Sequence, residues 1–174
     1  EQGAIMKRHF RVVAFVLLCA AATHSAAVLT LSAVESRKAH NPTVYNIGID
    51  PAIPIGGSIA VEPRLARTSH QVVFRFSDII ASVGTAKVIN GYGAPVGTAT
   101  PTISGNEVLV TLTGIPNNTR LTVALTGVNG TLDVAASVAF VVGDINRTGV
   151  VTASDISALK ARQGNAVNAS NSSL

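Results

Sequence analysis

The sequence predicts an all-β protein, an antiparallel β-sandwich of the immunoglobulin or fibronectin type over residues 28–142. Three observations predict it. About eight short segments rich in Val, Ile, Leu and Thr are separated by turns that contain Gly, Pro or Asn. Two of these segments place Val or Leu at every second residue, which is the period of a strand, and no window in this range has the period of a helix. Short strands at such spacing are typical of a two-sheet domain with one core.

The alternation is clearest in residues 108–112 and 121–125, where every second residue is Val or Leu. The connection between them, residues 114–119, contains one Gly, one Pro and two Asn, the residues of a tight turn. The other strands follow from similar punctuation. The expected strands are 28–37, 44–50, 59–64, 70–76, 85–90, 98–104, 107–113, 120–126 and 134–142. The residues expected to line the core are Phe74, Phe76, Val88, Ile103, Val110, Val123, Phe140 and Val142.

The start of the chain has the pattern of a Sec signal peptide. A basic stretch at 6–11 precedes an uncharged apolar run at 12–22, and Ser25 and Ala27 form a small-x-small exit. The run is shorter than the roughly 20 residues that a membrane span needs. We therefore expect a signal-peptide helix within residues 1–27, removed on secretion, with no membrane attachment afterwards.

Composition excludes several classes of protein. The chain is 47% hydrophobic and 13% charged, whereas disordered polyelectrolytes combine low hydrophobicity with high net charge. Cys19 is the only cysteine, which excludes a disulfide framework and a cysteine-rich zinc module. Loss of residues 1–27 removes three basic residues and one acidic residue, which lowers the net charge from +4 to +2. The remaining chain has no clustered basic run, so nucleic-acid binding is not expected.

The chemistry-bearing residues concentrate in residues 143–164. When Asp144 is counted as position 1 of a loop, oxygen-bearing side chains fall at positions 1, 3, 5, 9 and 12, and Gly149 falls at position 6. This is the spacing of an EF-hand-like calcium loop, in which position 7 offers its backbone carbonyl. A short helix is expected to follow the loop. Val151 is expected to pack the loop against this helix, and Gly164 is expected to end it. The residues at the five side-chain positions are Asp144, Asn146, Thr148, Thr152 and Asp155, and Val150 is at position 7.

The same residues resemble one repeat of a type I dockerin, the calcium-binding module with which secreted bacterial proteins attach to a cohesin. The resemblance rests on Asp-x-Asn-x-x-Gly, on Asp at position 12, and on Leu159 and Lys160 later in the helix. It implies that the ligands of Ca²⁺ are Asp144, Asn146, Thr148, Val150 and Asp155. It also implies that Ala153, Ser154 and Lys160 face the partner. Thr148 stands where dockerins usually carry Asp, which leaves two carboxylates in the loop and predicts weaker calcium binding.

Dockerins pair two such repeats, whereas one is present before the polar tail 165–174. The partner of the repeat is therefore expected to be a cohesin-like protein or a second repeat beyond Leu174, unless the repeat is a remnant. The expected divisions of the chain are a leader with the signal peptide (1–27), the sandwich (28–142), the loop–helix repeat (143–164) and the tail (165–174).

Three functions remain open, and none of them is enzymatic. The first is a secreted bacterial binding and assembly module that docks through the calcium loop. The second is an accessory component of an extracellular polysaccharide-degrading system, with a carbohydrate bound by the sandwich on Tyr45 and Tyr92. The third is a surface adhesin with a vestigial loop. The motifs of hydrolases and phosphate-binding loops are absent, and the carboxylates, among them Glu62 and Asp78, are scattered singly.

Overall fold

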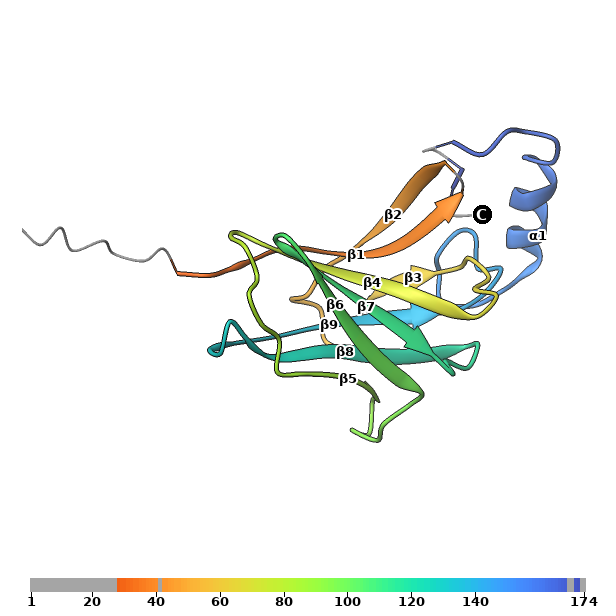
Figure 1. Ribbon diagram of the computed structural model, residues 1–174. Helices are drawn as coiled ribbons and strands as arrows, with labels where there is room; N and C mark the ends of the chain where they lie inside the picture. Colours follow the sequence, from red (N-terminus) through yellow and green to blue (C-terminus); the bar gives the residue numbers. More distant parts are fainter. Residues whose placement is uncertain (1–27, 41, 169–170, 173–174) are drawn as a thin grey trace, which may run out of the picture.

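The computed structural model describes residues 28–40, 42–168 and 171–172, and the expected signal peptide lies outside this range. Within it, nine strands form two sheets that stack face to face, with one short helix at the end of the sandwich (Figure 1). The all-β prediction is confirmed. The elements are β1 (Leu31–His40), β2 (Thr43–Ile49), β3 (Ala60–Glu62), β4 (Ser69–Phe76), β5 (Thr85–Asn90), β6 (Thr98–Ser104), β7 (Glu107–Thr113), β8 (Thr119–Val128), β9 (Leu132–Phe140) and α1 (Ala153–Lys160).

The first sheet has the strand order β2-β1-β4-β7-β6 and the second has the order β3-β9-β8-β5. Strand β2 contacts β3 at one lateral edge of the sandwich, and β5 contacts β6 at the other. The expectation of purely antiparallel sheets is wrong at one place, because β3 pairs with β9 in parallel. Strand β3 has only three residues, and Pro63, which has no N–H to donate to a ladder, follows it directly.

The core fills the space between the sheets as the alternation predicts. The inward residues Val108, Val110 and Leu112 of β7 are completely buried, as are the three on β8, at 121, 123 and 125. Six of the eight expected core residues are buried there, and two are not. Ile103 is 37% exposed because it lies on the edge strand β6, and Val142 is only half-buried because β9 ends at Phe140.

Charged side chains form a connected group on the outer face of the first sheet. Arg37 of β1 donates two hydrogen bonds to Glu107 of β7, at 2.9 and 3.1 Å, and Arg75 of β4 donates two more. Glu35 lies 3.4 Å from the same Arg75 guanidinium. The hydrogen bonds from Arg37, and then those from Arg75, outweigh partial burial and lower the pKa of Glu107 to about 2.

No helix among the residues that the structure describes is long and apolar enough to cross a membrane.

Leu112 and Leu109 of the same strand test the register of β7. Leu112 faces the core and is fully buried, whereas Leu109 is on the outer face and is only half-buried. We expect Leu112→Ala to lower the free energy of unfolding by about 2–5 kcal/mol, and Leu109→Ala by clearly less. Urea unfolding of both variants measures this difference. Equal losses would contradict the register.

Glu107 gives a prediction about pH. Its pKa of about 2 lies below the usual value of 4.5, so the stabilisation is complete above about pH 4.5 and disappears as the pH falls towards 2. We expect Glu107→Gln to cost about 1 kcal/mol at pH 7, since the group is partly solvated, and progressively less as the pH falls through the pKa of about 2. Unfolding free energies measured across this range, with Asp78→Asn as the control, test it. A pH-independent cost would refute the assignment.

Candidate calcium-binding site

The candidate loop, residues 144–155, begins directly after the second sheet. Val141 N–H donates to the carbonyl of Glu62 at 3.2 Å, and Gly143 N–H donates to the carbonyl of Pro63 at 2.9 Å. These bonds fasten the start of the loop to the segment that follows β3. Figure 1 shows the loop and α1 at this end of the sandwich, next to β3. The position of the loop is therefore fixed by backbone hydrogen bonds to the sandwich.

The first half of the loop is folded around the carboxylate of Asp144, which is completely buried. Its Oδ1 accepts the N–H of Thr148 at 3.0 Å and its Oδ2 accepts the N–H of Gly149 at 2.6 Å. Gly149 has a φ of +90°, a conformation that favours glycine, so the residue at position 6 makes the sharp turn that the spacing requires. This turn places the backbone N–H groups of Thr148 and Gly149 within hydrogen-bonding distance of the Asp144 carboxylate.

The second half of the loop is closed by Asp155, which is 1% exposed. Its Oδ1 accepts the N–H of Asn146 at 3.1 Å, and its Oδ2 accepts the N–H of Thr152 at 2.8 Å. Thr152 is the N-cap of α1, so Asp155 also completes a capping box. The hydrogen bonds from Asn146 and Thr152 hold the pKa of Asp155 below its usual value. Position 12 is thus joined to position 3 and to the start of the helix.

The remaining candidate ligands belong to the same hydrogen-bonded loop. The side-chain oxygen of Asn146 accepts the N–H of Thr148 at 3.2 Å, and the hydroxyl of Thr148 donates to the carbonyl of Val150 at 3.2 Å. The structure therefore brings all five predicted positions into one compact turn. Carboxylate, amide, hydroxyl and carbonyl oxygens are the ligands that Ca²⁺ takes.

The charge of the loop is unbalanced. Asp144 and Asp155 are both buried, and no ion pair within the described ranges involves either of them. Backbone N–H groups compensate part of this charge, but buried carboxylates are ordinarily paired with cations or metal ions. No group of three or more His, Cys, Asp or Glu side chains that could hold a metal occurs in the described part of the chain. A cation here would depend on neutral oxygens for its other ligands.

The predicted partner residues lie on α1 and are exposed. Ala153 begins the helix, Lys160 ends it, and the hydroxyl of Ser154 contacts Asn146 Nδ2 and Thr152 Oγ1, both at 2.8 Å. An exposed apolar set surrounds them, with exposed fractions between 52% and 58%. It consists of Val150, Val151, Ile156 and Leu159. Val151, which was expected to pack the loop against the helix, is about half exposed.

The helix ends earlier than expected. Regular α-helix stops at Lys160, and the next turns tighten, with Arg162 N–H donating to Leu159 and Gln163 N–H to Lys160, at 3.0 and 3.2 Å. Gly164, with a φ of +84°, ends this tighter path.

The two tyrosines proposed for carbohydrate stacking do not share a face. Tyr45 lies on β2, at one lateral edge of the sandwich, and its hydroxyl donates to the carbonyl of Val167 at 3.3 Å. Tyr92 is 97% exposed in the loop after β5, at the opposite edge. A flat platform that would stack a sugar on both rings is therefore absent between them.

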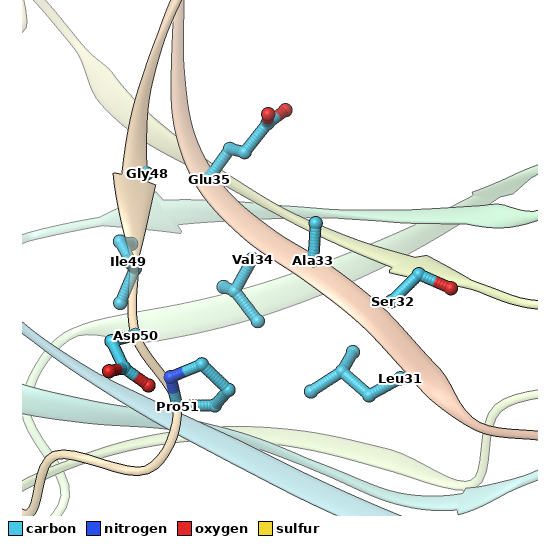
Figure 2. A pocket seen from close by; sticks show the side chains of 9 residues that line it. All are labelled: Leu31, Ser32, Ala33, Val34, Glu35, Gly48, Ile49, Asp50 and Pro51. Carbon is cyan, nitrogen blue, oxygen red and sulfur yellow. The ribbon is translucent and has the colours of Figure 1, made fainter.

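Two carboxylates border the cavity between the start of β1 and the end of β2 (Figure 2). Glu35 accepts hydrogen bonds from Asn46 and Arg75, and Asp50 caps the following turn by accepting the N–H of Ala52. Figure 2 shows the Glu35 side chain pointing away from Asp50. The two groups are engaged separately and do not form an acid–base pair.

Glu62 and Asp78 lie at different ends of the sandwich and do not form a carboxylate pair. Glu62 bonds to Ser36 in the middle of β1, whereas Asp78 follows β4, whose end pairs with the start of β1. Glu62 instead forms a buried ion pair with Arg64, with 2.7 Å between Arg64 Nε and Glu62 Oε1. This ion pair was not predicted from the sequence. The pattern that could have indicated it is Glu-Pro-Arg at residues 62–64, at the end of a short strand.

No protein-family model matches the sequence, and a search of curated proteins finds no significant match.

Proposed function

We propose that this chain is a secreted, non-catalytic binding and assembly module whose loop 144–155 binds Ca²⁺ and whose helix α1 docks to another protein. One observation supports it above all. Two buried carboxylates, Asp144 and Asp155, lie in one 12-residue turn with no cationic partner among the described residues. A calcium ion supplies the missing positive charge and accepts the remaining oxygens as ligands.

Calcium would be held by the side chains of Asp144, Asn146, Thr148 and Asp155 and by the carbonyl of Val150. The hydrogen bonds from Thr148, Gly149, Asn146 and Thr152 already orient both carboxylates, so little ordering is left for binding. The bound ion would add a second constraint on the start of α1, in addition to the capping box.

The exposed apolar set next to the loop supports docking. Val150, Val151, Ile156 and Leu159 are each at least half exposed, although large apolar side chains usually pack against another surface. Ala153, Ser154 and Lys160 border them. The partner that fits the resemblance is a cohesin-like protein or a second loop–helix repeat. We propose the immunoglobulin-like type for the sandwich on its strand number and spacing.

Calcium titration of the purified chain tests the metal site. We expect a saturable heat and a higher melting temperature in the chain as it is, and loss of both in Asp144→Ala. Thr148→Asp adds a third carboxylate and should tighten binding by about tenfold. Asp78→Ala removes an exposed carboxylate far from the loop and should leave the affinity unchanged. No heat and no thermal shift at millimolar calcium would overturn the metal claim.

A type I cohesin module tests the docking claim. We expect calcium-dependent association that Lys160→Glu weakens by about tenfold, because the substitution reverses a charge at the expected interface. Lys87→Glu, on β5 in the second sheet, is the matched control. Calorimetry with and without chelator measures both. Calcium binding without association would retain the metal site and exclude this partner.

A further inference from the structure

Three strands change from apolar to polar inward-facing residues at the same end of the sandwich. On β1 the inward row runs from Val34 to Ser36 and Lys38, and β4 begins its inward row with His70. Strand β3 ends with Glu62, which is 2% exposed. Apolar residues would continue these rows if this end served only to extend the core. The polar residues mark a separate site.

A cavity of about 400 Å³ lies among these residues, and we call it the basic cavity. It lies at the same end as the candidate calcium loop, because Glu62 both lines the cavity and accepts the hydrogen bond from Val141. Its apolar walls include Leu65 and Ala66. Its ionisable and polar walls are Arg37, Lys38, Glu62, Arg67, His70 and Gln71.

The basic cavity carries an excess of positive charge. The carboxylate of Glu62 is committed to Arg64 at 2.5 Å and to the hydroxyl of Ser36. Lys38 donates to the carbonyl of Leu65, and no ion pair in the described part of the chain involves Lys38 or Arg67. Two cations thus have no anionic partner.

The cations also repel one another. Burial lowers the pKa of Lys38, and Arg64 and Arg67 lower it further against the opposing attraction of Glu62. Charge of one sign gathered in a partly desolvated cavity favours a ligand of the opposite sign.

Two buried side-chain nitrogen atoms near the cavity also lack hydrogen-bond partners. Of the buried side-chain nitrogen and oxygen atoms that the structure describes, two have no hydrogen-bond partner, and these are Arg37 Nε and His40 Nε2. Both residues lie on β1 on either side of Lys38. Buried N–H groups are rarely left without acceptors. Arg37 lines the cavity, but its two Nη atoms are bonded to Glu107, so the cations free to meet an anion are Lys38 and Arg67.

We propose that the basic cavity binds an oxyanion, namely the carboxylate, sulfate or phosphate group of a small acidic ligand. Lys38 supplies a compact charge, and the Arg67 guanidinium supplies a planar pair of donors that matches two oxygens. The basic cavity is separate from the candidate calcium loop, because the candidate ligands in that loop are oxygen atoms, which bind a cation and not an anion.

His70 provides an internal reporter. Burial lowers the pKa of His70, Lys38 of β1 and Arg64 lower it further, and Glu62 of β3 opposes them. On the neighbouring strands, it pairs with Leu112 of β7, and its ring centroid lies 4.4 Å from that of Phe140 on β9. A bound oxyanion favours the charged imidazole and therefore raises this pKa.

NMR titration of the full chain in calcium-free buffer tests the proposal. Sodium sulfate is compared with sodium chloride at equal ionic strength, and galacturonate with galactose separates a carboxylate from a sugar ring. We expect saturable shifts of the amides of residues 65–71 and a rise in the His70 pKa with sulfate. Response to both anions assigns a general oxyanion site, and response to galacturonate alone assigns a carboxylate site.

Variants identify the cavity as the source of these shifts. Arg67 is exposed, so Arg67→Gln should leave the melting temperature unchanged and weaken binding by about tenfold, the effect of one charge-assisted hydrogen bond. Lys38→Gln should weaken binding by a similar factor, and Lys87→Gln is the matched control. The proposal is overturned if neither sulfate nor galacturonate produces shifts beyond those of chloride and galactose, or if Arg67→Gln and Lys38→Gln bind as tightly as the control.

Discussion

The guanidinium of Arg64 joins the two sheets at the end of the sandwich where the functional features gather. It donates to both carboxylate oxygens of Glu62 on β3, to the carbonyl of Ser36 on β1 and to the carbonyl of Tyr45 on β2. The side chains of Arg64 and Glu62 are 1% and 3% exposed. Because a buried charge that loses its partner costs about 3–5 kcal/mol, this pair fixes the relative position of three strands.

The same short segment also positions the loop–helix repeat. The carbonyls of Glu62 and Pro63 accept the N–H groups of Val141 and Gly143, so the chain leaves β9 along a fixed path into Asp144. Asp144 and Asp155 then organise the loop from within, each by accepting backbone N–H groups. The candidate calcium loop is therefore held from outside by the sandwich and from inside by its own carboxylates.

Local sequence patterns predicted the features that depend on residues close together in the chain, namely individual strands and the loop. The alternation in β7 and β8 gave the correct strands and faces, and the spacing from Asp144 to Asp155 predicted a loop whose residues the structure does bring together. Long-range pairing was not predictable in this way. The parallel pairing of β3 with β9, and the edge position that exposes Ile103, both depend on which strands become neighbours.

The basic cavity is the clearest example of a feature that local sequence patterns could not predict. Lys38, Glu62 and His70 are far apart in the chain, and each alone resembles an ordinary surface residue. The first strand was expected to end at residue 37, but β1 continues to His40, and its inward row carries Lys38 into the cavity. Only the register of β1 with β4 places these side chains at one end.

The central claim is that the two buried carboxylates in the loop 144–155 bind a cation. Crystallography of the chain in millimolar calcium, with anomalous scattering to identify the ion, tests this most directly. The account predicts one calcium ion bound by Asp144, Asn146, Thr148, Val150 and Asp155, with oxygen distances of about 2.3–2.6 Å. A loop with the same fold but only water, or no ion, next to Asp144 would contradict it.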